Sequence, residues 1–275
     1  MSRPRLGAGQ ARRGGGTAPA VRPGLRHVGT GRKWDILRDV TDTLKVKIFA
    51  DGADLAEIAR LAENPLIGGF TTNPTLMWKA GLTEYTEFAR RMLEVVPDRP
   101  ISFEIFADDQ PEMRRQAEVI AAWGDNVFIK VPVTDTRGNS TAELVRALSC
   151  EGVQLNITAL MLASQVETVT AAVADGAPCY ISVFAGRIAD AGVDPLPIMV
   201  ESLAIMRSAP LAELIWASPR EVFNVVQAND IGCHVITVTN DILAKLPTLG
   251  KNLEEFSLDT VKMFHRDATA AGFTL

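Results

Sequence analysis

The residues of this sequence with the clearest capacity for chemistry are one lysine and two carboxylates, each inside a short apolar segment. Lys130 lies in VFIKVP, Asp51 ends VKIFAD, and Glu104 interrupts ISFEIF. Charged side chains are almost never fully buried without partners, and a lone lysine in a strand is more often a surface residue. The apolar neighbours of Lys130 argue against an exposed strand. We therefore interpret Lys130 as the centre of a site.

A buried lysine suits imine chemistry because its amine is a nucleophile only when neutral. At the ordinary pKa of lysine, ~10.4, fewer than about one amine in a thousand is neutral at pH 7. Burial disfavours the ammonium form and so favours the nucleophile. An amine that attacks a ketone and loses water gives a cationic imine, which draws electrons from the neighbouring carbon–carbon bond. Carboxylates must then move protons, and Asp51 and Glu104 are the candidates.

These residues belong to a regular alternation of short apolar, β-branched segments with longer helical patterns. The strand candidates are residues 46–51, 68–73, 101–106, 127–132, 153–158, 180–185, 213–218 and 234–239. Alternating strands and helices imply parallel strands with crossover helices, and eight such units close a barrel. A doubly wound open sheet also alternates, but no G-x-G-x-x-G follows the first strand. The pattern favours a (β/α)8 TIM barrel.

Polar residues recur at the same end of six consecutive strand candidates, with a spacing of two residues. Since side chains alternate between the two sides of a strand, such pairs share one face. Active sites of barrels lie at the carboxyl ends of the strands. Besides the lysine and the carboxylates, the residues in this phase are Thr71, Asn73, Asn156, Thr158 and Ser182, the last on one face with Tyr180 and Phe184.

An additional helix is predicted at the C-terminal end, from Leu253 to Ala271. Asn252 is a plausible N-cap and Gly272 a plausible stop. Residues 240–246 suffice for the closing helix of the eighth unit, so this helix is surplus to the barrel. It packs either on its own barrel or on a neighbouring subunit, and the sequence does not choose between the two.

Composition bounds the class of protein. A chain of 275 residues with 47% hydrophobic content can form one large core, and no apolar run approaches the ~20 residues that span a bilayer. Residues 1–33 hold eight of the 28 basic residues and no acidic residue, so residues 34–275 have a net charge of −13. This acidic body argues against nucleic-acid binding. It does not argue against a small anionic substrate.

The domain organisation follows from the difference in composition between residues 1–33 and residues 34–275. Residues 1–33 are rich in Gly, Pro and Arg, and we predict a disordered tail. A flexible tail or a wrongly set start is favoured over a transit peptide, because Ser2 is the only serine there. Residues 34–275 are predicted to form a single barrel domain.

The cysteines and histidines indicate neither disulfides nor metal. Cys150, Cys179 and Cys233 are few and scattered, and we expect them to be buried reduced thiols of a cytoplasmic protein. The histidines, which are His27, His234 and His265, show no ligand spacing. Because imine chemistry needs neither metal nor cofactor, we expect none.

Six linked motifs in strand order resemble the transaldolase family of class I aldolase-type barrels. They cover about residues 45–240 and are FADGAD, GFTTNPT (69–75), FIKVPVT (128–134), LNIT (155–158), ISVFAGRI (181–188) and ASPR (217–220). The resemblance implies a transferase of dihydroxyacetone units between sugar phosphates of the sedoheptulose 7-phosphate and fructose 6-phosphate type, in a pathway like the pentose phosphate pathway. It also implies a homo-oligomer.

The resemblance implies roles for residues at matched positions. Lys130 is similar to the Schiff-base lysine and Asp51 to the general acid/base, while Glu104 and Thr158 match the pair that holds the catalytic water. Residues that match those orienting the sugar and the lysine are Thr71, Asn73 and Asn156, with Ser182 nearby. The phosphate clamp corresponds to Arg187, Ser218 and Arg220.

The residues themselves support the phosphate clamp. Ser218 is a candidate N-cap with Pro219 as the first helical residue. A helix N-terminus together with arginine forks is an anion site. The alternative is that Arg187 and Arg220 are surface charges.

Two positions bear on the subtype. Smaller members of the fructose-6-phosphate aldolase type tend to have glutamine in place of Glu104 and tyrosine in place of Phe184, so this chain has the transaldolase pattern. In contrast, FIKVPVT and the short barrel resemble the smaller subfamily. Transaldolase is therefore the leading hypothesis, with an aldolase or a specialised sugar transferase as the alternative and a silent barrel subunit as the third.

Overall fold

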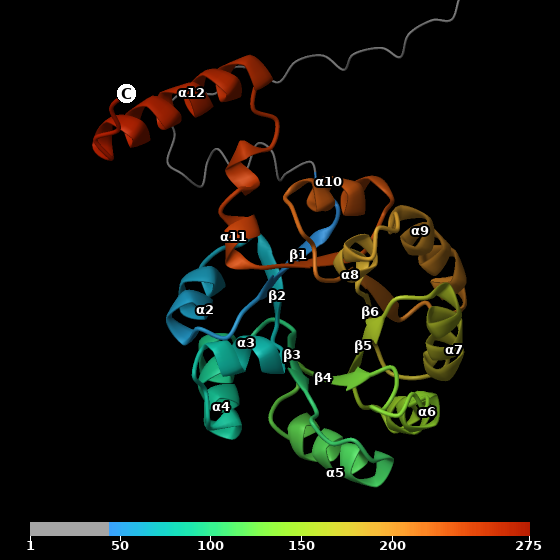
Figure 1. Cartoon of the computed structure of the whole chain (residues 1–275). Coiled ribbons are helices and arrows are strands. Elements are labelled where there is room, and N and C mark those ends of the chain that lie inside the picture. Colours follow the sequence, from blue (N-terminus) through green and yellow to red (C-terminus); the bar gives the residue numbers. More distant parts are fainter. Residues whose placement is uncertain (1–43) are drawn as a thin grey trace, which may run out of the picture.

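The computed structural model describes residues 44–275, which form a closed barrel of eight parallel strands in sequence order (Figure 1). The strands are β1 (Lys47–Asp51), β2 (Ile67–Thr71), β3 (Ile101–Glu104), β4 (Val127–Pro132), β5 (Leu155–Leu160), β6 (Cys179–Val183), β7 (Ala212–Trp216) and β8 (Val235–Val238). All eight predicted strands are confirmed, with ends displaced by up to two residues. The predicted (β/α)8 fold is therefore confirmed.

Helices surround the barrel and connect successive strands (Figure 1). They are α2 (Leu55–Ala62), α3 (Pro74–Lys79), α4 (Tyr85–Val95), α5 (Gln110–Ala121), α6 (Ala142–Cys150), α7 (Ala163–Val173), α8 (Ala185–Asp190), α9 (Leu196–Ile205), η1 (Met206–Ser208), α10 (Phe223–Asp230), α11 (Asn240–Leu243), η2 (Leu246–Thr248) and α12 (Leu253–Ala270). Their apolar residues and the outward side chains of the strands form the main core. This layer fixes the strands that carry the site.

A smaller apolar cluster fills the barrel interior beneath the carboxyl ends of the strands. The ring of Tyr180 lies edge-on to Phe49, with centroids 5.4 Å apart, and 4.6 Å from the ring of Phe128. Gly69 makes room for this packing, because a Cβ at that position would lie 2.6 Å from the Phe49 ring. Aromatic rings thus fill the barrel interior on the amino-terminal side of Lys130. The cavity opens at the carboxyl ends of the strands, where active sites of such barrels lie.

Helix α12 is set apart from the barrel, as Figure 1 shows. Its N-cap is Asn252, whose side chain accepts hydrogen bonds from the N–H groups of Glu254 and Glu255, and Gly272 follows its end with φ +69°. None of its residues is buried. The sequence left open whether this helix packs on its own barrel or on a neighbouring subunit. Packing on its own barrel is not observed.

One prediction about the cysteines is wrong. Cys179 and Cys233 are buried, but Cys150 is exposed, because it is the last residue of α6 and faces solvent. All three are free thiols. The predicted disordered tail, residues 1–33, lies outside the described residues.

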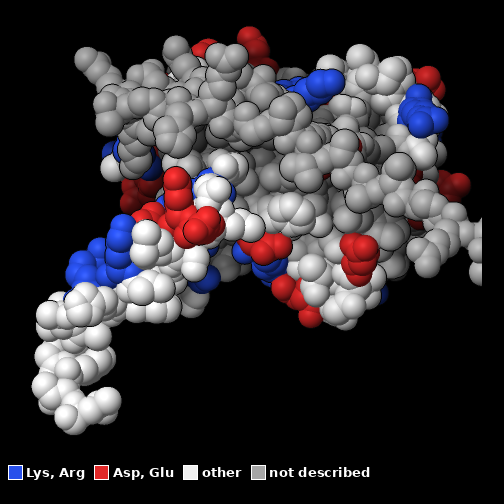
Figure 2. Space-filling view, turned by 90° about the horizontal axis from the view of Figure 1, so that it is seen from above, with Lys and Arg blue, Asp and Glu red and all other residues white. Residues whose placement is uncertain are grey.

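No helix between residues 44 and 275 has the length and apolarity needed to cross a membrane. On the face seen in Figure 2, acidic and basic side chains of the described residues lie close to one another. The charge of the described part is therefore mixed on this face.

Candidate active site

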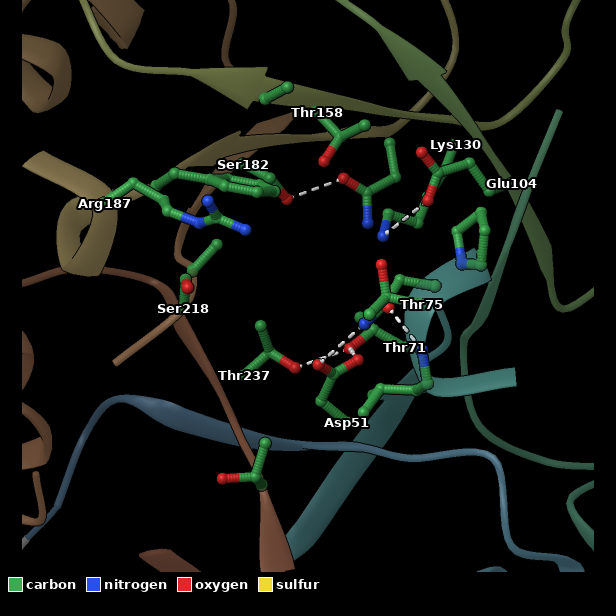
Figure 3. A pocket seen from close by; sticks show the side chains of 18 of the residues that line it. Asp51, Thr71, Thr75, Glu104, Lys130, Thr158, Ser182, Arg187, Ser218 and Thr237 are labelled. Atoms are coloured by element: carbon green, nitrogen blue, oxygen red, sulfur yellow. Dashed lines mark hydrogen bonds and ion pairs between the residues drawn. The ribbon is translucent and has the colours of Figure 1, made fainter. Parts of the chain in front are cut away.

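A cavity of about 530 Å³ opens at the carboxyl ends of the barrel strands. Figure 3 shows Lys130 and Glu104 entering it from one side, with Arg187 and Ser218 on the opposite side. All twelve residues predicted from the sequence for the site line this cavity, namely Lys130, Asp51, Glu104, Thr158, Thr71, Asn73, Asn156, Ser182, Phe184, Arg187, Ser218 and Arg220. The structure thus brings together residues that are up to 169 positions apart in the chain, from Asp51 to Arg220.

Lys130 is placed by the register of three adjacent strands. It pairs with Glu104 of β3 on one side and with Asn156 of β5 on the other, so that all three side chains share one interior layer. Its side chain is only 8% exposed, and Nζ lies 3.2 Å from Glu104 Oε2. Nζ also donates a hydrogen bond of 2.9 Å to the carbonyl oxygen of Thr72. The amine is therefore held in a defined position inside the barrel.

Asp51 ends β1 next to Thr71 of β2 and belongs to a chain of hydrogen bonds. Thr71 Oγ1 donates to Asp51 Oδ1 at 2.8 Å, and Asn73 Nδ2 donates to Oδ2 at 3.2 Å. The hydroxyls of Thr71 and Thr237 are 2.6 Å apart. When Asp51 is ionised, the Thr71 hydrogen is directed to the carboxylate and Thr237 donates in that contact.

The surroundings of Asp51 raise the pKa of its carboxyl group. Burial raises its pKa above the usual value for aspartate, and the charge of Glu104 acts in the same direction. Lys130 and the hydrogen bonds from Thr71 and Asn73 oppose this shift without cancelling it. The pKa of Asp51 is thus moved toward the range in which a carboxyl group can both accept and return a proton.

Asn156 is fixed by two serines on the flanking strands. Its Nδ2 donates to Ser102 Oγ at 2.9 Å, and Ser182 Oγ donates to its Oδ1 at 2.7 Å. Two residues further along β5, Thr158 Oγ1 is buried and has no hydrogen-bond partner among residues 44–275. Buried hydroxyls normally have a partner, so this one is available to a molecule in the cavity.

The opposite side of the cavity is cationic. Arg187 of α8 is exposed there, and Arg220 follows β7. The predicted N-cap at Ser218 is wrong: α10 begins only at Phe223, and Ser218 has a φ of +59°. The side-chain oxygen of Asn224 instead accepts hydrogen bonds from the N–H groups of Arg220 and Glu221. Residues 218–222 thus precede the helix.

Comparisons with known proteins identify the family to which this chain belongs. The family model described as transaldolase/fructose-6-phosphate aldolase matches residues 48–275. This chain belongs to that family. A probable transaldolase of a Chelativorans species is 37% identical over 221 residues, which cover 79% of this chain and 97% of the relative. Probable transaldolase 2 of Listeria monocytogenes is 31% identical over 218 residues, covering 78% of this chain and 95% of the relative.

Similarity to solved structures extends to the fold alone. A putative lyase/mutase from Burkholderia cenocepacia has a TM-score of 0.51 and 12% identity, covering 86% of this chain and 90% of that chain. The protein called KGPDC from Streptococcus mutans has a TM-score of 0.51 and 11% identity, covering 73% and 90%. At these identities, only the barrel architecture is shared.

Sequence reasoning missed several residues of this transaldolase-family cavity. Thr237 and Thr239 of the β8 segment line it, as do Thr75 and Lys79 of α3. The two threonines are spaced by two residues in HVITVT, so the alternation used for the other strands could have found them. Thr75 and Lys79 carry no such signal, because they approach the cavity from a helix. Among the described residues, no group of three or more His, Cys, Asp and Glu side chains is arranged to hold a metal ion.

Proposed function

We propose that this member of the transaldolase/fructose-6-phosphate aldolase family is a transaldolase that forms a Schiff base at Lys130. It would move a three-carbon dihydroxyacetone unit from a ketose phosphate to an aldose phosphate. The observation that carries the proposal is the position of Lys130 Nζ, buried in the barrel, 3.2 Å from Glu104 and facing the cavity that Asp51 also lines. No other lysine of the described chain combines burial with this cavity.

The first steps form the imine. The neutral amine of Lys130 attacks the ketone carbon, and the resulting carbinolamine loses water. Glu104 moves protons to and from that oxygen, because its carboxylate lies beside Nζ. Thr158, with its buried and unpartnered hydroxyl, holds the water together with Glu104.

The following steps break and remake a carbon–carbon bond. Asp51 takes the proton of the hydroxyl on the carbon that becomes an aldehyde, and the bonding electrons pass to the imine, giving an enamine on Lys130. The first aldose phosphate leaves, and the enamine attacks a second aldehyde, to which Asp51 returns the proton. Hydrolysis of the new imine releases the product and the free amine. Residues Asn156, Ser182, Thr71 and Asn73 hold the hydroxyls of the three-carbon unit.

The cationic side of the cavity suits the phosphate group. Arg187 and Ser218 face Lys130 and Glu104 across the cavity (Figure 3), and Arg220 lies beside Ser218. Arginine is well suited to phosphate because its planar fork matches two phosphate oxygens. A phosphorylated ketose can therefore place its ketone at Lys130 and its phosphate beside Arg187 and Ser218.

We also propose that the chain forms a homo-oligomer in which α12 is a contact. Its side chains Leu253, Phe256, Leu258, Val261, Met263 and Phe264 are between 40% and 81% exposed. Apolar groups gathered on one helix are stabilised by burial against another surface.

Acceptor dependence separates transaldolase from aldolase activity. With fructose 6-phosphate alone, we expect little release of free dihydroxyacetone, and addition of erythrose 4-phosphate should give rapid formation of sedoheptulose 7-phosphate. A coupled assay of both products measures this. Steady release of dihydroxyacetone at the same rate without an acceptor would instead support the aldolase alternative.

Two residues of the cavity are expected to set that balance. Glu104→Gln together with Phe184→Tyr removes one carboxylate and adds a hydroxyl that can protonate the enamine, so the three-carbon unit is released instead of transferred. The ratio of aldolase to transferase rate should rise at least roughly tenfold. Phe106→Tyr adds the same hydroxyl outside the cavity and should leave the ratio unchanged. An unaltered ratio in the double variant would remove this explanation.

A further inference from the structure

The guanidinium of Arg220 is almost fully engaged by protein oxygens. Its Nε donates to Asp190 Oδ1 at 2.8 Å and its Nη2 to Asp190 Oδ2 at 2.5 Å. Its Nη1 donates to both the carbonyl oxygen and the hydroxyl of Ser218, at 3.0 and 2.9 Å. Of the five N–H groups of an arginine, these contacts use four. Arg220 therefore has little capacity left to bind a phosphate directly.

The contact with Arg220 makes the Ser218 hydroxyl a hydrogen-bond acceptor on that side. Arginine has no acceptor atom, so Ser218 Oγ must accept, and its own hydrogen remains available for another oxygen. Ser218 lines the cavity on the same side as Arg187 (Figure 3). The hydroxyl hydrogen can therefore be donated to an anion in the cavity.

The backbone of this turn is held in place from the neighbouring loop. Ser218 has a left-handed φ of +59°, and its carbonyl oxygen lies against Gly186, where a Cβ would be only 1.6 Å away. Asp190 ends the same helix α8 that carries Arg187. The two loops after β6 and β7 are thus joined by the glycine contact and by the Asp190–Arg220 pair.

We propose that Asp190 is a positioning residue of the anion site, which holds Arg220 so that the Ser218 hydroxyl donates to a phosphate monoester also bound by Arg187. Asp190 does not line the cavity and acts only through Arg220. The proposal deepens the proposed function, on which it rests for the identity of the phosphate as part of a sugar.

The direction in which anion affinity changes, when the charge of Asp190 is removed, distinguishes a positioning role from simple electrostatic repulsion. A carboxylate near an anion site weakens anion binding by repulsion, so removing its charge should tighten binding if electrostatics alone matters. If Asp190 positions Arg220 and Ser218, removing its charge should weaken binding, because a charge-assisted contact that orients the donor is lost.

The test is calorimetric binding of inorganic phosphate to the full-length protein. We expect Asp190→Asn to weaken binding roughly tenfold. Glu151→Gln is a matched control, because Glu151 makes a similarly exposed pair with Arg114 between α5 and the end of α6, away from the cavity. It should leave binding unchanged. On a Ser218→Ala background, Asp190→Asn should cause no further loss, since both act through the same hydroxyl.

Several results would overturn the inference. They are unchanged or tighter phosphate binding in Asp190→Asn, a full additional loss on the Ser218→Ala background, or no binding of phosphate by the unsubstituted protein. Borohydride trapping with dihydroxyacetone, which has no phosphate, separates this inference from the proposed function. Asp190→Asn should trap as much as the unsubstituted protein. If neither the unsubstituted protein nor Asp190→Asn is trapped, while Asp190→Asn still binds phosphate more weakly, the Schiff base is refuted. The positioning role of Asp190 is then retained.

Discussion

Lys130→Met is expected to lower the turnover of fructose 6-phosphate by on the order of a thousandfold or more, because the covalent route through the imine is lost. Methionine keeps most of the volume of the lysine side chain, so the packing of the interior layer should survive. A coupled rate assay together with a thermal melt measures both quantities. Near-normal turnover in the folded variant would contradict the role given to Lys130.

A second lysine of the barrel offers a matched control for this substitution. Lys47 of β1 also pairs with a carboxylate, since its Nζ lies 2.6 Å from Glu213 Oε2, but it does not line the cavity. Lys47→Met should therefore retain turnover. Loss of activity in both variants to the same degree would indicate damage to the barrel instead of to the imine chemistry.

Asp51→Asn is expected to reduce turnover by about 10²- to 10⁴-fold, the usual contribution of a positioned general acid or base. The amide cannot take the hydroxyl proton during bond cleavage, whereas the lysine needed for the imine is still present. Trapping with dihydroxyacetone should accordingly persist while the transfer reaction fails. A variant that transfers normally would show that another group moves this proton.

The pH dependence of stability gives an independent check on Asp51. The pKa of Asp51 is raised in the folded protein, so binding of a proton to this carboxyl group favours the folded state. This contribution to the free energy of unfolding is fully present below the pKa that Asp51 has in the unfolded chain. It is lost as the pH rises through the pKa of the folded protein. Asparagine is neutral throughout and loses nothing over that range. The melting temperature of Asp51→Asn relative to the unsubstituted protein should therefore be higher at pH 7 than at pH 4. A difference that does not change with pH would contradict the raised pKa.

Much of the site could be predicted because strand geometry is regular. Polar residues two apart in a strand share a face, and parallel strands in a closed barrel bring their carboxyl ends to one opening. Those two rules place Lys130, Glu104 and Asn156 in one layer, and the observed register makes them direct neighbours. The same alternation reaches Thr237 of the eighth strand.

The remaining features depend on individual side-chain contacts, which leave no periodic pattern in the sequence. Ser218 and Pro219 look like the start of a helix, yet the Asn224 side chain satisfies the N–H groups of residues 220 and 221 and the helix starts at Phe223. The pairing of Asp190 with Arg220 joins residues 30 positions apart on different loops. The first contact competes with a helix start that the residue types also allow, and the second joins two segments whose proximity only the folded barrel creates.

The most direct test of the central claim is borohydride reduction in the presence of fructose 6-phosphate, followed by mass mapping of the peptides. We expect a single stable adduct of a three-carbon unit on Lys130, formed by reduction of the imine. An adduct on another lysine, or the absence of any adduct in protein that turns over the sugar phosphate, would contradict it.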